Sequence, residues 1–178
     1  ANLDVWAVRL RCDGDQLSAP FRVNTTTGPN DVDPGIALSD ERVLVAWVSD
    51  RGPVDGGTGT DNLDIRYRVL EADATPVMAE DATLETTHGG EPVPDNAWFP
   101  EAKGLPEGGF VIAGTRVLQA AEAFQVFAQR LDADGALDGE AVDGHVETDV
   151  TQTSPSVGVS SAGALHMAIM FYESAARC

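Results

Sequence analysis

The stretch VFAQRLDADG at residues 126–135 occurs in the chain in two further forms, VWAVRLRCDG at 5–14 and IRYRVLEADA at 65–74. The three copies start about 60 residues apart. Each copy alternates apolar and polar residues and then enters a short polar turn, which is typical of a strand with one buried face. A pattern that returns at a fixed spacing indicates an internal repeat.

Two further segments follow each copy in the same order. The first is a short strand pattern, with the versions FRVNTTT (21–27), ATLETTH (82–88) and GHVETDV (144–150). The second is longer, has a proline at its second position, and has the versions DPGIALSDERVLVAWVSD (33–50), FPEAKGLPEGGFVIAGTR (99–116) and SPSVGVSSAGALHMAIMF (154–171). Each longer segment predicts a hairpin, with a short strand, a polar turn and a more apolar strand.

The repeat predicts a single all-β domain over 1–178, built from three pseudo-repeats of about four antiparallel strands. Two units cover about 33–88 and 99–150, and a split unit combines 1–27 with 154–172. We expect the two halves of the split unit to share one sheet.

Composition also favours an all-β fold. The chain has 18 Gly and 10 Pro and only short apolar segments, as a β protein with many turns does. The strongest helical candidate, VLQAAEAFQVFAQRL at 117–131, overlaps the repeated strand, so we expect its second half to be a strand. No apolar run reaches the ~20 residues that a membrane-spanning helix needs, and we therefore predict no membrane span.

The order RLDADG, FxVNT and a GGFVVAW-type hairpin resembles a repeat of secreted bacterial β-propellers, which is found in multi-copy extracellular proteins. The resemblance implies β-propeller-like blades and an extracellular or cell-surface location. The middle unit departs most from the pattern, with Ala74 in place of the turn glycine and Glu85 where the first unit has Asn24.

The number of units bears on the assembly. Three blades are fewer than the about four to eight that propellers usually have. The resemblance therefore implies a homo-oligomeric ring, a place in a larger assembly, or a fragment of a longer repeat array. The alternative fold is a β-trefoil, which also has three pseudo-repeats of four strands and often binds carbohydrate.

The net charge is −18, from 29 acidic and 11 basic residues. Nucleic acid is excluded as a partner, because so few cations cannot neutralise a phosphate backbone. The same charge disfavours anionic membrane surfaces. A protein or a glycan remains as a candidate partner.

The segment RLDADGALDGE has three carboxylates, Asp132, Asp134 and Asp138, at the spacing of compact calcium loops, and Ca²⁺ is the one cofactor that the sequence suggests. Arg130 stands at the first ligand position of such a loop and would repel the cation. The other interpretation is a β-turn whose Asp side chains accept hydrogen bonds from backbone amides. A second acidic group flanks the glycine-rich segment 49–62, where we expect a solvated loop: Asp50, Asp55, Asp61 and Asp64.

Cys12 and Cys178 are the two cysteines of the chain. A disulfide between them would join the two ends and would suit a secreted protein. Two thiols with no histidine at ligand spacing do not make a zinc site.

Motifs for catalysis are lacking, since the chain has neither a Gly-x-Ser-x-Gly nucleophile elbow nor a phosphate-binding loop. We expect Trp6, Trp47 and Trp98 to pack in the core, with Trp98 the most exposed of the three. The sequence favours a non-enzymatic extracellular binding or structural module that uses the loops at a blade rim. A calcium-dependent or carbohydrate-binding lectin-like domain is the alternative. A glycosidase comes third, because no pair of carboxylates stands out among 29 acids.

Overall fold

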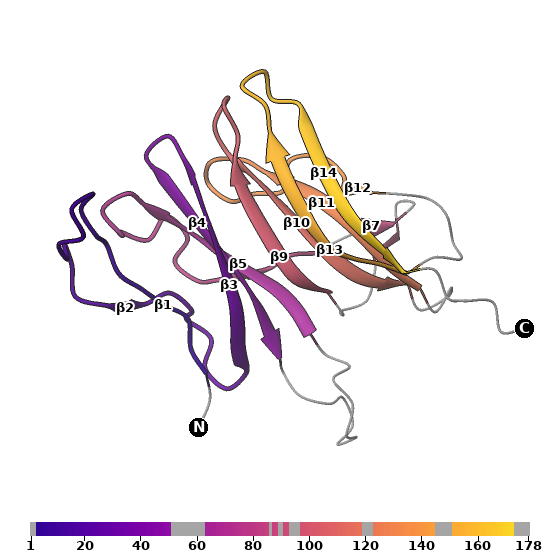
Figure 1. The fold of residues 1–178 in the computed structure, drawn as a ribbon. Helices are drawn as coiled ribbons and strands as arrows, with labels where there is room; N and C mark the ends of the chain where they lie inside the picture. The colour runs from indigo at the N-terminus through magenta and orange to yellow at the C-terminus, as the bar shows by residue number, and fades with distance from the viewer. Residues whose placement is uncertain are drawn as a thin grey trace, which may run out of the picture.

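The computed structural model describes residues 3–50, 63–85, 87–88, 91–92, 97–118, 123–144 and 151–172. Every regular element in these ranges is a β-strand, which confirms the all-β prediction (Figure 1). Among the described residues, no helix is long and apolar enough to cross a membrane. The strands are β1 (Trp6–Ala7), β2 (Phe21–Arg22), β3 (Asn30–Ser39), β4 (Arg42–Asp50), β5 (Leu63–Glu71), β6 (Ala82–Thr83), β7 (Thr87–His88), β8 (Glu91–Pro92), β9 (Ala97–Gly104), β10 (Phe110–Leu118), β11 (Ala123–Leu131), β12 (Val142–Asp143), β13 (Thr151–Val159) and β14 (Leu165–Tyr172).

Two four-stranded sheets form the middle of the molecule. The first has the strand order β3-β4-β5-β6 and the second has the order β9-β10-β11-β12, and all neighbouring strands are antiparallel. The first sheet runs from Asn30 to Thr83 and the second from Ala97 to Asp143, whereas the repeat predicts units at 33–88 and 99–150. The strand β11 also covers the second half of the helical candidate at 117–131, as expected from the repeat.

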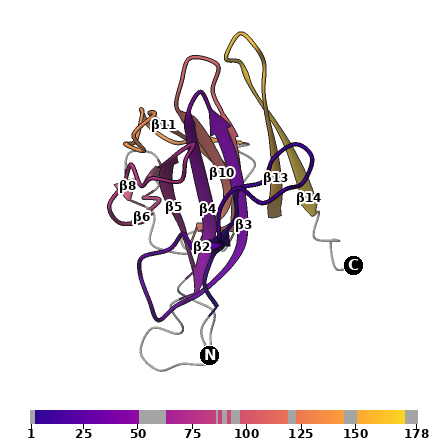
Figure 2. The same cartoon turned by 90° about the vertical axis from the view of Figure 1, so that its left-hand side faces the viewer.

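Of the remaining strands, β7 and β8 form a short separate pair, and the other four lie at the two ends of the row of sheets. β1 pairs with β2 in what we call the N-terminal pair, which packs on β4, while the hairpin β13–β14 packs on β9, β10 and β11 (Figures 1 and 2). The two halves of the split unit, 1–27 and 154–172, therefore lie in separate sheets within the described chain. The sheets form an open row and not a closed ring, so neither a propeller nor a trefoil is shown, and closure stays a prediction.

The largest core lies between the two four-stranded sheets. Leu44 from β4, Phe110 from β10 and Phe127 from β11 are fully buried there. Burial of a side chain of this size contributes about 1.5–3 kcal/mol to stability. The backbones of the two sheets approach each other very closely at Gly104, where a Cβ atom would lie only 1.9 Å from the carbonyl oxygen of Leu38. Any larger residue at this position would force the sheets apart.

The three tryptophans differ in exposure from what the sequence predicts. Trp47 is fully buried between β4 and the N-terminal pair, as expected. Trp6 is 60% exposed and Trp98 is half-buried, so the prediction that Trp98 would be the most exposed is wrong. The physical reason is that Trp98 packs edge-on against Phe99 and Phe124, whereas β1 has a neighbouring strand on one edge only.

The turn that follows each repeated strand has the same geometry in all three copies. The N–H of the residue at positive φ donates to the carbonyl oxygen three residues earlier, with N···O distances of 2.9 to 3.2 Å. The φ angles are 93° at Gly14, 76° at Ala74 and 91° at Gly135. Ala74 thus keeps the turn of the other copies although its Cβ atom disfavours this conformation.

A buried carboxylate fastens the N-terminal pair to the first sheet. Asp81 accepts hydrogen bonds from the backbone N–H groups of Thr25 and Thr26 at 2.7 and 3.1 Å and from both of their hydroxyls. Its Oδ2 atom lies 2.6 Å from Nε of Arg66. Burial raises the pKa of Asp81, but the hydrogen bonds from Thr25 and Thr26 and the Arg66 guanidinium outweigh it and hold the pKa at about 2.

Replacing Ala74 by glycine should raise the free energy of unfolding by about 0.5 to 1 kcal/mol, because glycine adopts positive φ without strain. Urea denaturation followed by circular dichroism measures the change. The converse change Gly14→Ala should be destabilising through backbone strain alone, since no atom lies within 4 Å of a Cβ there. Gly135→Ala should cost more, because its Cβ would lie 2.7 Å from Met78 Sδ. Equal losses at the two glycines would contradict this account.

Asp81→Asn should lower the free energy of unfolding by about 2 kcal/mol at pH 7, because the folded state binds the ionised carboxylate more strongly than the unfolded state does. The pKa of Asp81 is lowered on folding, so this stability is present above pH ~4 and is lost as the pH falls towards about 2. Urea curves of parent and variant should therefore converge in acid. The control Asp138→Asn removes an exposed partner of Arg130 and should show no comparable pH-dependent difference.

Candidate functional site

A cleft opens at one rim between the two four-stranded sheets, and we call it the rim cleft. Its volume is about 480 Å³. The rim is the end of the sheets at which β3, β5, β9 and β11 begin and β4 ends. The cleft is lined by residues from both sheets: Asn30, Val32, Asp33, Val48, Asp50, Leu63, Trp98, Phe99 and Phe124.

Three aromatic side chains form one wall of the rim cleft. The Trp98 ring lies 6.4 Å from the Phe99 ring and 5.3 Å from the Phe124 ring, centroid to centroid, and both pairs are edge-to-face. Phe99 is 46% exposed and Phe124 is 36% exposed, so both rings present apolar surface to solvent. Each ring supports the others while one face or edge stays open to a ligand.

Oxygen acceptors come from the first sheet. Asp33 and Asn30 are exposed at the start of β3, and Asp50 is half-buried at the end of β4. Asp31, between the two exposed residues, is buried on the opposite face of β3, and burial raises the pKa of its carboxyl. The cleft thus combines aromatic surface with carboxylate and amide oxygens, whereas Asp31 belongs to the packing beneath it.

A bulge in the first strand of each unit shapes the rim. The residues directly before the three repeated prolines, Asp33, Phe99 and Ser154, have φ angles of 51°, 55° and 51°, and the strand register shifts at each of these points. Bulges of this kind re-aim a side chain. Positive φ is uncommon for any residue with a Cβ and is a true outlier for a bulky one such as Phe99. The positive φ itself is shared by all three units, so what distinguishes this one is that the strained position carries the large ring of Phe99.

The three predicted calcium ligands lie at the opposite rim, in the turn that follows β11. The Oδ1 atom of Asp132 accepts hydrogen bonds from the N–H groups of Asp134 and Ala136, both at 2.9 Å. Asp138 lies 3.4 Å from the guanidinium of Arg130. These contacts are the ones that the turn interpretation predicts. In the described ranges, no three metal-ligating side chains come close enough to hold an ion.

The other sequence candidates are dispersed. Asp50 lines the rim cleft, Asp64 is buried in β5, and Asp55 and Asp61 lie outside the described residues. Cys12 is exposed, but Cys178 lies outside the described residues, so the disulfide stays a prediction.

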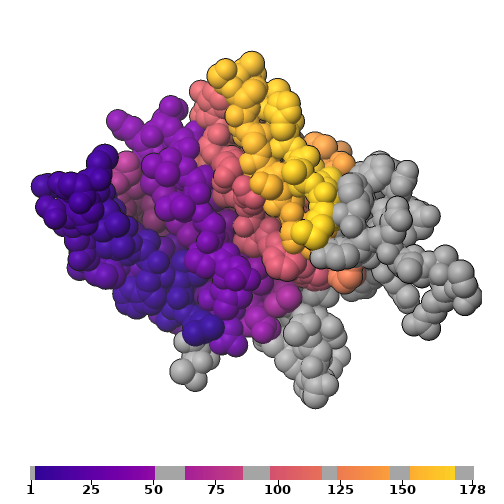
Figure 3. Space-filling view, in the orientation of Figure 1, coloured from indigo at the N-terminus to yellow at the C-terminus, as the bar shows by residue number. Residues whose placement is uncertain are grey.

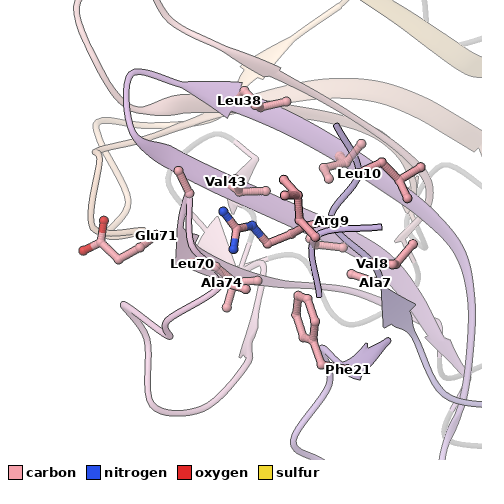
Figure 4. Close-up of a pocket in the computed structure, with 14 residues that line it drawn as sticks. Ala7, Val8, Arg9, Leu10, Phe21, Leu38, Val43, Leu70, Glu71 and Ala74 are labelled. Atoms are coloured by element: carbon pink, nitrogen blue, oxygen red, sulfur yellow. The ribbon is translucent and has the colours of Figure 1, made fainter. Parts of the chain in front are cut away.

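A second hollow, which we call the end groove, lies between the N-terminal pair and the first sheet (Figure 4). Its volume is about 280 Å³. Apolar side chains line most of it, among them Leu10, Leu38 and Val43, while the Arg9 side chain extends across it and Glu71 points away from it (Figure 4). A surface of this composition suits an apolar strand better than a polar small molecule.

Comparison with known proteins gives a likeness of fold only. No protein-family model and no curated protein matches the chain. Among solved structures, an endo-arabinase from Bacteroides thetaiotaomicron VPI-5482 is similar, with a TM-score of 0.51 and 12% sequence identity. The match covers 89% of this chain and 57% of the endo-arabinase, so the chain spans less than two thirds of that protein's length.

Sequence reasoning marked Asp50 and Trp98 but did not bring them together. The rim cleft joins residues of two units that are about 65 positions apart, and its aromatic wall occurs in one unit only. A repeat search therefore passes over it. The signal that could have found it is the phenylalanine before the repeated proline, since Asp and Ser stand there in the other units.

Adding Ca²⁺ should leave the melting temperature unchanged, because Asp132 already accepts hydrogen bonds from two backbone amides and Asp138 lies beside the guanidinium of Arg130. Thermal unfolding with calcium and with a chelator measures this. A rise in melting temperature with calcium that disappears in Asp132→Asn would instead make the turn a metal site.

Proposed function

We propose that the protein is a non-enzymatic extracellular binding module whose rim cleft holds a neutral glycan. Ligand sites combine apolar and aromatic walls with a few polar groups that fix orientation. In the rim cleft, Trp98 and Phe99 supply the apolar surface and the oxygens of Asp33 and Asp50 can accept hydrogen bonds from sugar hydroxyls. The observation that carries the proposal is Phe99, a bulky residue held at positive φ with its ring 46% exposed in the cleft.

Charge narrows the class of glycan. The net charge of −18 and two carboxylates in the cleft would repel uronic acids and sulfated sugars. Neutral sugars meet no such cost, and their hydroxyl groups form charge-assisted hydrogen bonds with carboxylates. The preferred ligand is therefore an uncharged oligosaccharide.

Hydrolysis is the second candidate function. Glycoside hydrolysis uses two carboxyl groups that flank the bond to be cleaved, and Asp33 and Asp50 line the same cleft. The similar fold of an endo-arabinase supports testing this reaction, although that likeness concerns the fold. Release of reducing ends that disappears in Asp33→Asn would replace the binding proposal by this one.

Titration calorimetry with neutral arabinan, xylan and mannan oligosaccharides should give binding for at least one of them and none for oligogalacturonate. Phe99→Asn and Trp98→Ala should each weaken that binding about tenfold, the loss expected for one aromatic contact. Asparagine tolerates positive φ, so Phe99→Asn removes the ring and leaves the bulge intact.

Trp6→Ala is the matched control, because it removes an aromatic side chain of 60% exposure outside the rim cleft. It should bind like the parent protein. Binding that is unchanged in Phe99→Asn, or preferred binding of the charged oligogalacturonate, would contradict the proposal.

A further inference from the structure

The N-terminal pair corresponds to the third and fourth strands of a unit. Its segment 5–11 matches β5 and β11 in sequence, and each of those strands is nine residues long with a partner on both edges. In the N-terminal pair, by contrast, only the two residues of β1 are in a strand, and they pair with β2 alone. One edge of segment 5–11 is therefore open in the described chain.

The hairpin β13–β14 corresponds to the first and second strands of a unit. In both four-stranded sheets the second strand pairs with a third, as β4 does with β5 and β10 with β11. β14 pairs only with β13 in the described chain, so its outer edge is open as well. In the strand order of a complete unit, the open edge of β14 would pair with the open edge of segment 5–11, as a second strand pairs with a third.

Burial at one repeated position shows where such a hairpin would sit. Ile36, Ala102 and Val157 occupy equivalent places in the first strands of the three units, two residues past the register shift. Ala102 and Val157 are each 3% exposed, because the preceding unit covers them. Ile36 is 60% exposed and Leu38 is 68% exposed, and both line the end groove. The end groove is thus the place that the first two strands of a preceding unit would fill.

The hairpin also presents a suitable surface. Its face away from the second sheet carries Gly158, Ala168 and Met170, all exposed, and no atom lies within 4 Å of a Cβ placed on Gly158. By strand register, Gly158 and Ala168 correspond to the buried Ala37 and Ala46 of the first sheet, and the exposed His166 corresponds to the buried Leu44. Apart from His166, the side chains on this face are small or flexible, with Ser156 beside Ala168, so a second sheet can approach the hairpin closely.

We propose that the end groove receives the hairpin β13–β14 of a second copy of this chain, and that the two copies do so reciprocally. Each hairpin then pairs along the open edge of segment 5–11 in the other copy and covers Ile36 and Leu38. The chain's own hairpin cannot reach its groove, because the two lie at opposite ends of the row of sheets (Figure 3). Two copies joined in this way form one closed ring of six units.

The full chain should have twice its monomer mass of 18.7 kDa in sedimentation velocity at micromolar concentration. Two copies of charge −18 repel each other, so raising NaCl from about 50 to about 500 mM should strengthen the pair. A mass of one copy, or of more than two, would overturn the proposal.

Leu38→Asp places a charge in the end groove and Ala168→Glu places a charge on the hairpin face. Each variant alone should be monomeric. Both side chains are exposed in the single chain, so neither change should lower its melting temperature by more than a few degrees. The control Leu137→Asp alters a leucine of 48% exposure outside the groove and should remain dimeric.

An equimolar mixture of Leu38→Asp and Ala168→Glu separates head-to-tail pairing from other modes. The intact hairpin of the first variant fits the intact groove of the second, so the mixture should recover a two-copy species with at least tenfold weaker affinity than the parent. A mixture that stays monomeric, or a parent pair that survives Leu38→Asp, would overturn the proposal.

Discussion

Both four-stranded sheets are apolar on both faces, and this constraint governs the rest of the structure. Along β4, Leu44 and Ala46 pack toward the second sheet while Val45 and Trp47 pack toward the N-terminal pair, and all four are buried. A sheet of this kind cannot be stable with one face in water, because that face would expose a contiguous apolar surface. Each unit therefore needs a neighbour on both sides, which explains the row of stacked sheets and the exposed leucine and isoleucine where a neighbour is incomplete.

Stacking leaves only the rims of the sheets free to carry function. Side chains in the middle of β4 or β10 are used for packing, whereas strand ends and bulges project between units without disturbing the core. The bulge before each repeated proline is part of the scaffold, because it occurs in all three units. What differs is the side chain placed on it, and only the second unit places an aromatic ring there, at Phe99. The same bulge thus presents a different side chain in each unit.

The repeat made most of the fold predictable, and tertiary contacts account for what it missed. The equal spacing of the repeat predicted four-stranded units and a strand in the helix-forming segment before Leu131. The segment is a strand because its pairing with β10 outweighs its local helix propensity. The predicted exposure of Trp98 was wrong because its side chain packs against Phe99 and Phe124, and Phe124 belongs to a strand that is distant in the sequence. The burial of Arg116 could not be predicted from the sequence either. It is fully buried beside Asp143 and Gln125, where burial lowers the pKa of the guanidinium and the Asp143 carboxylate opposes that shift.

The rim cleft and the end groove use different residues, and this separation has a consequence for affinity. The cleft lies between the two complete sheets, so its shape does not depend on what fills the groove. A pair of copies would carry two identical rim clefts held at a fixed distance. A single cleft with a few aromatic and carboxylate contacts binds a short sugar weakly, but two clefts that engage one polymer gain an effective concentration in the second contact. Pairing would therefore matter most for long glycans and little for short ones, which follows from geometry and needs no change within either cleft.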